Sequence, residues 1–308
     1  MVKKIFCILV AIGFCSLFVN TSFAMFSAAD AGTGSGQFLK MEPGARAGAM
    51  GSAYSAISDD STAIYWNPAG LAQMKSGSIC FMHALWFEEI AYDWFSVAQP
   101  VGKFGAIGLG FQYLNYASIP CFDISGNDCG SLTSYDMAAS LSYAKRLGAL
   151  SLGATAKYIS SKLDNTATTM AYDGGLMYRF KNKRLSLGCA VQNIGGSLKY
   201  YEESIDIPMN LRFGAGYRFS KKFLVTCDVS AADGAPKYGA GAEYKHKAGE
   251  ETSILIRGGY NTKGSDAGGL GGISAGLGIS YKSFALDYAF VPYGKIGDTN
   301  RISLGIKY

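Results

Sequence analysis

The sequence predicts an all-β protein: a transmembrane antiparallel β-barrel of about 14 strands, with a short helical N-terminal plug, or hatch, in its lumen. Three observations support this prediction. Polar and apolar residues alternate in segment after segment up to the chain end, the connections between these segments are alternately short and long, and aromatic residues bracket the apolar faces. These are the sequence features of a barrel whose outer surface faces lipid.

The first 24 residues read as an export signal. Lys3 and Lys4 supply the positive start, residues 5–19 the apolar run, and Ser22-Phe23-Ala24 a cleavage site of small-x-small type. An N-terminal membrane anchor is the alternative, but the apolar run is short for a membrane span. The mature chain is therefore expected to start at Met25.

The next segment, residues 25–77, is the predicted plug. Most of it is rich in Gly, Ala and Ser and shows no alternation, so it suits short helices that pack closely in a narrow lumen. Ser58 or Asp59 can cap a helix, and Pro68 can end it. Residues 78–308 then form the predicted barrel, and the plug is expected to enter it from the periplasmic side.

The barrel strands follow from alternation along the chain. At the end of the chain, Ile302, Leu304 and Ile306 share one side of an extended segment, opposite Arg301 and Lys307. The predicted strands cover residues 79–88, 91–100, 104–116, 135–145, 150–158, 171–180, 185–193, 211–219, 223–230, 237–244, 253–260, 271–281, 284–290 and 301–308.

The connections give an orientation. Those after even-numbered strands are short, such as 146–148 and 282–283, whereas most of those after odd-numbered strands are longer, such as 117–132 and 196–208. Bacterial outer-membrane barrels have short periplasmic turns and longer outer loops. Both ends of the barrel are therefore expected in the periplasm.

Aromatic residues supply an independent test. Tyr172 with Tyr178, and Tyr238 with Tyr244, bracket the apolar faces of their strands, as expected for the two interfacial girdles. The inner face of a soluble β-sandwich is the alternative, but it needs a partner sheet. An open sheet edge is not viable in hydrocarbon, so the last strand must pair with the first. Tyr308, at the chain end, is the expected assembly signal.

The face opposite the apolar one carries charges of both signs. By parity, the following residues are expected to face the lumen: Asp136, Lys157, Asp173, Arg179, Arg212, Arg218, Asp228, Glu243, Arg257, Asp287, Arg301 and Lys307. They could simply be solvated in a wet channel, or some of them could anchor the plug. Arg301 and Lys307 could reach Asp59 and Asp60 of the plug.

Composition narrows the function classes. Charged residues make up only 17% of the chain, and the net charge of +5 includes Lys3 and Lys4 of the export signal. A small and evenly spread positive charge does not indicate nucleic-acid binding. Of the cysteines after the signal, only Cys121 and Cys129 lie close together, and whether they form a disulfide is left open. Cys80, Cys189 and Cys227 fall within strands and suit small apolar fillers.

Catalysis has little support in the sequence. The two histidines, His83 and His246, stand in no context that suggests a nucleophile relay. No metal-ligand spacing, phosphate loop or paired-carboxylate motif is present, so neither a metal nor a cofactor is expected.

The plug carries a specific combination of motifs. It contains Gly48-x-x-Gly51-x-Ala53, the pair Asp59-Asp60, and residues 67–71, Asn-Pro-Ala-Gly-Leu. Together with residues 287–305, these motifs resemble FadL-like outer-membrane proteins, and most closely the PorV/PorQ family. The residues of the plug motif are Arg46, Gly48, Gly51, Asp59, Asp60, Asn67, Pro68 and Gly70.

The resemblance implies a 14-stranded barrel of the bacterial outer membrane with a hatch in its lumen, and no enzymatic activity. FadL moves long-chain fatty acids through such a barrel, which suggests passage of hydrophobic compounds. PorV instead helps a secretion system to deliver exported proteins to the cell surface, which is the alternative. The implied partners are outer-membrane lipids, the outer-membrane assembly machinery, and either hydrophobic small molecules or secreted proteins.

Overall fold

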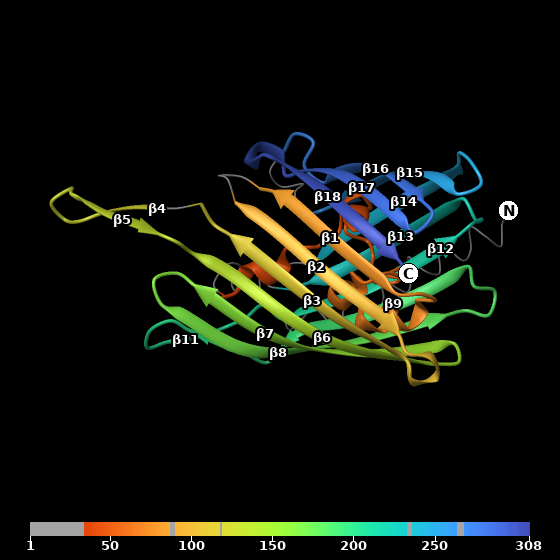
Figure 1. The fold of residues 1–308 in the computed structure, drawn as a ribbon, viewed down its shortest axis with the longest axis horizontal. Coiled ribbons are helices and arrows are strands. Elements are labelled where there is room, and N and C mark those ends of the chain that lie inside the picture. Colours follow the sequence, from red (N-terminus) through yellow and green to blue (C-terminus); the bar gives the residue numbers. More distant parts are fainter. Residues whose placement is uncertain (1–33, 87–89, 118, 233–235, 264–267) are drawn as a thin grey trace.

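The computed structural model describes residues 34–86, 90–117, 119–232, 236–263 and 268–308. Within them, 14 antiparallel strands form one closed barrel (Figure 1). The barrel strands are β1 (Ser78–Leu85), β2 (Ala91–Pro100), β3 (Ala106–Asn115), β6 (Tyr135–Leu147), β7 (Leu150–Lys162), β8 (Thr166–Arg179), β9 (Leu185–Ile194), β12 (Asn210–Arg218), β13 (Phe223–Ala231), β14 (Lys237–Lys247), β15 (Thr252–Asn261), β16 (Ile273–Tyr281), β17 (Phe284–Pro292) and β18 (Asp298–Lys307). The predicted fold class and strand number are confirmed.

The barrel closes where the sequence predicts. β1 pairs with β18 in antiparallel register, from Ser78 opposite Lys307 to Leu85 opposite Asn300. Tyr308 follows β18, and its N–H donates to the carbonyl of Gly77 at 3.1 Å. A closed sheet leaves no edge of unpaired backbone groups, which a lipid environment requires.

Two small hairpins lie in the long loops and were not predicted. β4 (Ile119–Phe122) pairs with β5 (Asp128–Leu132), and β10 (Ser197–Lys199) pairs with β11 (Ser204–Asp206). The β4–β5 hairpin projects well beyond the barrel body (Figure 1). These loops define the long-loop end of the barrel, and the opposite end is the short-turn end.

The outer surface of the barrel is apolar, and its inner face carries buried charges. Large apolar side chains such as Leu109, Leu141, Leu277 and Ile302 are exposed, whereas Arg212 on the inner face is only 1% exposed. An apolar exterior around buried charges indicates that lipid surrounds the barrel. None of the helices in the described ranges has the length and apolar character needed to span a membrane.

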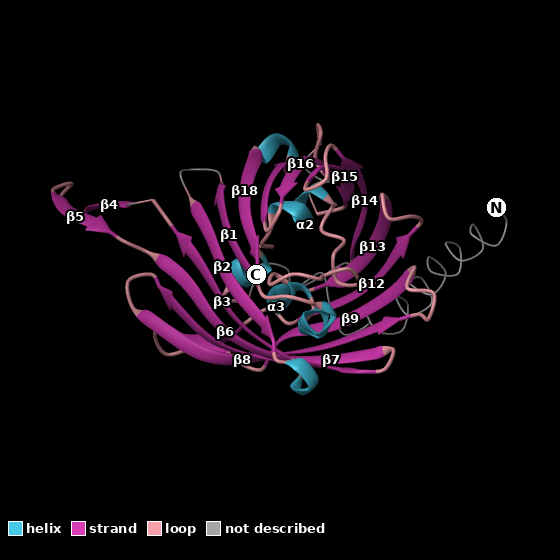
Figure 2. Ribbon diagram, turned by 45° about the vertical axis from the view of Figure 1, so that its right-hand side comes forward, coloured by secondary structure: helices cyan, strands magenta, loops and turns pink. Residues whose placement is uncertain are grey.

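Residues 34–77 lie inside the barrel, where short helices are visible behind the strands (Figure 2). They form η3 (Gln37–Lys40), α2 (Ala45–Ala49), α3 (Ala63–Trp66) and η4 (Pro68–Gln73). Two further turns of 3-10 helix, η6 (Gly102–Phe104) and η8 (Gly294–Ile296), lie in connections between barrel strands. The predicted export signal lies outside the described residues.

The inner segment runs the whole length of the lumen. The N–H of Ser35 donates to the carbonyl of Asp206 in β11 at 3.0 Å, which places the start of this segment at the long-loop end. Gly77 lies at the short-turn end, beside Tyr308. The expectation that the segment enters from the periplasmic side is therefore wrong for its first residues, because the alternation that locates strands carries no information on a path through the lumen.

Candidate functional site: the plugged lumen

Glu42, which belongs to none of the sequence motifs, makes a buried contact between the inner segment and the barrel. Its carboxylate accepts from Arg212 of β12 at 2.6 Å, and it also pairs with Lys263 and with Ser52. Burial opposes ionisation of Glu42, but the charges of Lys263 and Arg212 hold its pKa at about 2. Glu42 is therefore a buried carboxylate that stays charged because two cations surround it.

A second ionic contact is centred on Arg46, in helix α2. Its guanidinium binds Glu243 of β14 at 2.8 Å and Asp59 at 2.9 Å, and Asp60 lies 3.8 Å away. Burial opposes ionisation of Asp59, but the charge of Arg46 keeps its pKa below the usual value. Arg46 thus ties the inner segment both to itself and to the barrel wall.

The ionic contact continues along the wall. Glu243 also accepts from Arg257 of β15 at 2.8 Å, and Arg257 donates to Asp287 of β17 at 2.6 Å. The result is a row of alternating charges from the inner segment to β14, β15 and, beyond β16, β17. Charge-assisted hydrogen bonds of this kind are short and strong, and they fix orientation.

Asp228 of β13 holds the backbone of the inner segment rather than a side chain. One of its carboxylate oxygens accepts from the N–H groups of Tyr54 and Ser55, at 3.1 and 2.9 Å. The amide of Asn67 donates to the carbonyls of Ser55 and Leu176, at 2.9 and 3.0 Å. These bonds satisfy backbone groups that would otherwise be buried without partners.

The Asn-Pro-Ala-Gly-Leu motif caps and begins the 3-10 helix η4. The side chain of Asn67 accepts from the N–H of Ala69 at 3.1 Å, and Pro68 occupies the first position of η4. This position suits proline, which has no N–H to donate. Gly70 is required because a Cβ there would lie 2.3 Å from the carbonyl oxygen of Ser58.

The other motif glycines allow the inner segment to approach the wall. Gly51 has a φ of 62°, and a Cβ on it would lie 2.5 Å from the carbonyl oxygen of Tyr260. Gly259 of β15 faces it, and a Cβ there would lie 2.1 Å from the nitrogen of Gly51. Gly48 lies against Arg301, with 3.1 Å between a Cβ and the guanidinium. The backbone of Gly51 therefore lies directly against the backbone of β15, with no room for a side chain between them.

Arg301 contacts the inner segment at a different place from the one expected. It donates to the carbonyl of Glu42 at 2.9 Å and to the hydroxyl of Tyr293 at 3.1 Å. The expected contact of Arg301 with Asp59 and Asp60 is wrong, because Arg46 lies between and binds those carboxylates. Lys307 lies near Asp59 at the short-turn end, without an ion pair.

The remaining charges of the predicted lumen set make no ion pair with the inner segment among the described residues, although the ammonium of Lys157 lies 5.9 Å from the centroid of the Tyr65 ring. Asp173 of β8 binds Lys157 of β7 at 2.8 Å, and Asp136 of β6 accepts from the hydroxyl of Tyr116 at 2.6 Å. Arg179 and Arg218 lie at the short-turn end and are partly exposed. The set is therefore divided: some of its members anchor the inner segment, others brace the wall, and the last group surrounds the mouth.

The lumen near the long-loop end is apolar and aromatic. Tyr92 and Trp94 of β2 face inward and are buried, and the ring of Tyr65 meets Trp94 edge-on with 6.1 Å between centroids. The guanidinium of Arg212 lies 4.8 Å above the ring of Trp66. The apolar residues that line or fill this region are Phe38, Leu39, Tyr65, Trp66, Met82, Tyr92, Trp94, Leu114, Leu198 and Ile207.

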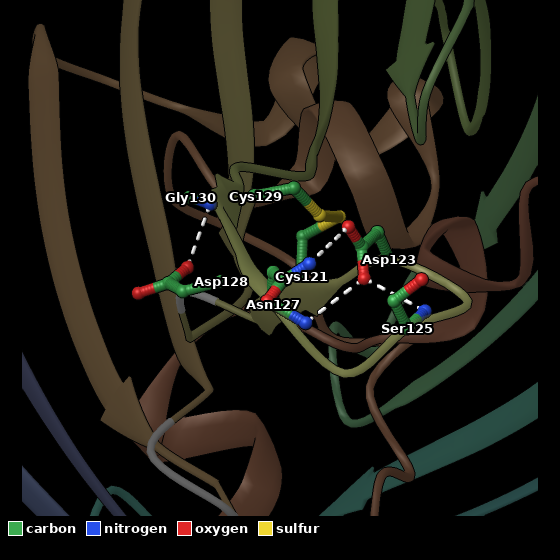
Figure 3. Close-up of a disulfide and its surroundings, with 7 residues drawn as sticks. All are labelled: Cys121, Asp123, Ser125, Asn127, Asp128, Cys129 and Gly130. Carbon is green, nitrogen blue, oxygen red and sulfur yellow. Dashed lines mark hydrogen bonds between the residues drawn. A yellow bond between two sulfur atoms is a disulfide. The ribbon is translucent and has the colours of Figure 1, made fainter.

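The β4–β5 hairpin is closed by a disulfide between Cys121 and Cys129, whose Cα atoms are 5.2 Å apart (Figure 3). At its tip the carboxylate of Asp123 accepts from the N–H groups of Ser125 and Asn127, both at 2.8 Å. Hydrogen bonds from the Asn127 side chain and from these backbone groups lower the pKa of Asp123. The hairpin therefore holds its shape without contact with the barrel body.

Neither histidine belongs to a group of side chains arranged for catalysis. His83 bonds Asp93 at 2.7 Å on the outer surface of the barrel, and His246 is exposed at the end of β14. In the described part of the chain, no three His, Cys, Asp or Glu side chains are grouped so that they could hold a metal ion.

Comparison with known proteins agrees with this architecture. The model of the uncharacterised protein family UPF0164 matches residues 20–229. The chain belongs to this family. A search of curated proteins finds no match.

Solved structures similar to this UPF0164 member include two transporters and a channel. The toluene transporter TbuX of Ralstonia pickettii is 13% identical, with a TM-score of 0.58, and the match covers 87% of this chain and 98% of TbuX. The toluene transporter TodX of Pseudomonas putida is 11% identical, with a TM-score of 0.59, over 86% and 97% of the two chains. The CymD monoaromatic hydrocarbon channel is 13% identical, with a TM-score of 0.53, over 86% and 96%. At these identities the likeness establishes the fold, and it agrees with the 14-stranded barrel expected from the sequence.

Proposed function

We propose that this protein is a non-enzymatic barrel of the bacterial outer membrane that passes hydrophobic compounds, with residues 25–77 as the plug of its lumen. The observation that carries the proposal is the apolar, aromatic region of the lumen near the long-loop end. A channel for ions or sugars would need a polar lining there. An apolar lining instead offers a hydrophobic molecule a place to leave water.

The orientation follows from the two ends of the barrel. Long loops face the outside and short turns the periplasm in bacterial outer-membrane barrels. The apolar region then lies at the outer entrance, where hydrophobic compounds arrive. Outer-membrane lipids would surround the apolar belt, and Tyr308 at the end of β18 would serve recognition by the assembly machinery.

The plug must move for passage, because it fills the lumen. Its polar contacts with the wall are reversible: the ion pairs of Glu42 and Arg46, and the hydrogen bonds to Asp228. A compound that occupies the apolar region would displace Phe38, Leu39 and the aromatic rings beside them. The likeness to hydrocarbon channels supports this function over the accessory role in secretion.

Intrinsic fluorescence gives a direct test. The chain has three tryptophans, and two of them, Trp66 and Trp94, are buried in the lumen. We expect a brominated fatty acid to quench them saturably, and toluene to compete with it. Brominated phospholipid is the control, because it reaches the outer belt but cannot enter the lumen. Quenching by the fatty acid that is non-saturable, or no stronger than that by the phospholipid, would refute the proposal.

A further inference from the structure

Cations gather at the short-turn end of the barrel. Fifteen of the lysines and arginines lie in its turns, at the strand ends that lead into them, or just before β1: Lys75, Lys103, Lys145, Arg146, Arg179, Lys181, Lys183, Arg184, Arg218, Lys221, Lys222, Lys245, Lys247, Lys282 and Lys307. The turns themselves contain only two acidic residues, Glu250 and Glu251. This end is therefore strongly positive, although the net charge of the whole chain is only +5.

The opposite end has no such excess. Its described loops and hairpins carry acidic residues such as Asp123, Asp164, Glu202 and Glu203 beside a few lysines. The positive charge is thus a property of one face of the molecule. A general need for solubility would not place it on that face alone.

These cations form two groups. Nine lie in the turns, before β1, or on the outward side of a strand end, where they could also meet lipid headgroups. The other six share the lumen-facing parity of their strands: Arg146, Arg179, Arg218, Lys245, Lys247 and Lys307. Lys245, for example, comes two residues after Glu243, which binds the plug. Headgroups outside the barrel cannot reach this inner group, which we call the mouth cations.

The two groups lie close together, and few carboxylates balance them: Asp59 of the plug interacts electrostatically with Arg179, Arg218 and Lys307. The N–H of Arg218 donates to the carbonyl of Arg184, and that of Lys245 to the carbonyl of Lys222, both at 2.8 Å. Among the described residues, Lys282 is the one member of the fifteen with a carboxylate within 4 Å, namely Glu251 at 3.4 Å. Neighbouring like charges repel each other, so an anionic partner would stabilise this face.

A cavity opens among the mouth cations. It has a volume of about 350 Å³, and its charged lining comprises Arg46, Arg218, Lys245, Arg257, Lys282 and Lys307 with the carboxylates of Asp59, Asp60, Glu243 and Asp287. All four carboxylates pair with Arg46 or Arg257, which leaves Arg218, Lys245 and Lys307 for a ligand. An extended chain carrying carboxylates could enter the cavity. A small anion would engage only these few cations and leave the turns unused.

We propose that the short-turn end is a docking face for an acidic segment of a periplasmic protein, with its carboxylates among the mouth cations and its flanks on the turns. Charge complementarity over the whole face favours a protein over a small anion, and the inward parity of the mouth cations favours it over a membrane. The proposal rests on the proposed orientation of the barrel but not on its cargo.

The test uses the full mature protein in nanodiscs of phosphatidylcholine and a fluorescein-labelled peptide of 12 glutamates, with a peptide of 12 glutamines as control. Fluorescence anisotropy should show binding of the glutamate peptide alone, weakening as salt is raised. A variant with Arg179→Gln, Arg218→Gln, Lys245→Gln and Lys307→Gln should bind at least roughly tenfold more weakly, because four charge-assisted contacts are lost. Heat-modifiable gel mobility would show that it is folded.

The matched control removes the same charge from the turns, with Lys103→Gln, Lys181→Gln, Lys183→Gln and Lys221→Gln, and should lose much less affinity. Equal losses in the two variants, or equal binding of both peptides, would overturn the proposal. So would full competition by millimolar phosphate, which would indicate a small-anion site. Loss of binding in phosphatidylglycerol nanodiscs would identify lipid as the occupant and would also overturn it. Tryptophan quenching on the same variants tests passage separately.

Discussion

The buried ion pair of Glu42 gives the most specific prediction for the plug. Replacing Glu42 with Gln removes the negative charge but keeps the shape of the side chain. Arg212, 1% exposed, then loses its carboxylate and keeps Gln192 and the rings of Trp66 and Tyr65 as uncharged partners. Lys263 is less affected, because its side chain is 28% exposed and can turn toward water.

The expected loss of free energy for docking of the plug follows from the exposed fractions of Arg212 and Lys263. Breaking a buried ion pair by removing one partner costs about 3–5 kcal/mol. Because Lys263 can regain contact with water, we expect the Gln variant to destabilise the docked plug by about 3 kcal/mol, the lower end of this range. A change of about 1.4 kcal/mol is tenfold in an equilibrium constant, so the docked state should weaken roughly hundredfold.

Hydrogen exchange measures this change directly. The amides of Tyr54 and Ser55 donate to Asp228 and exchange only when the plug opens, so their protection should fall roughly hundredfold in the Gln variant. Amides of the barrel strands should keep their protection. Glu202→Gln, an exposed loop substitution with the same charge change, is the control. Unchanged protection at Tyr54 and Ser55 would refute the reasoning.

Three further predictions concern the same plug. Gly259→Ala should destabilise the docked plug by about 1–3 kcal/mol, because the new methyl group meets the backbone of Gly51. Hydrogen exchange of the plug amides equal to that of the parent would argue against this close approach. The pKa of Glu42 is about 2 in the folded protein, against an ordinary value of 4.5. The stabilisation that its ionised carboxylate gives the docked plug is therefore present above pH 4.5 and is lost as the pH falls toward 2. Protection of the plug amides should therefore decline over that window, and less steeply in Glu42→Gln; parallel declines would exclude Glu42 as a contributor. Deleting residues 34–77 should raise single-channel conductance in planar bilayers, and equal conductance would show that the segment does not block the lumen.

The barrel strands could be read from the sequence because lipid imposes a simple rule. Each strand must present apolar residues on one face, so Ile302, Leu304 and Ile306 reveal β18 without knowledge of any partner. Loop length then orders the strands and orients them. The hairpins β4–β5 and β10–β11 escaped because they lie in solvent, where no face must be apolar.

The contacts of the plug could be predicted only in part. Parity places Arg212, Asp228 and Glu243 in the lumen, but it cannot say which plug residue each one meets. Glu42 stood outside the motifs and gave no signal of its own. A single buried carboxylate looks like any surface glutamate until the fold surrounds it with Arg212 and Lys263.

The central claim, that hydrophobic compounds pass when the plug moves, is tested most directly by locking the plug. A Cβ built on Gly216 of β12 lies 3.8 Å from the Cβ of Ile57 in the plug, a distance that suits a disulfide. The double variant Ile57→Cys, Gly216→Cys, with Cys80, Cys189 and Cys227 replaced by Ala, would be expressed in a bacterial host without its own FadL-type channel. The measurement is uptake of a labelled long-chain fatty acid, and of labelled toluene, by intact cells before and after reduction.

We expect little uptake while the disulfide is closed and restored uptake after reduction. The parent barrel without the two new cysteines is the control, because reduction also opens Cys121–Cys129 and should leave its uptake unchanged. Equal uptake by the locked and released forms would contradict a moving plug. Uptake no higher than that of host cells without the barrel, in every form, would contradict the passage of these compounds.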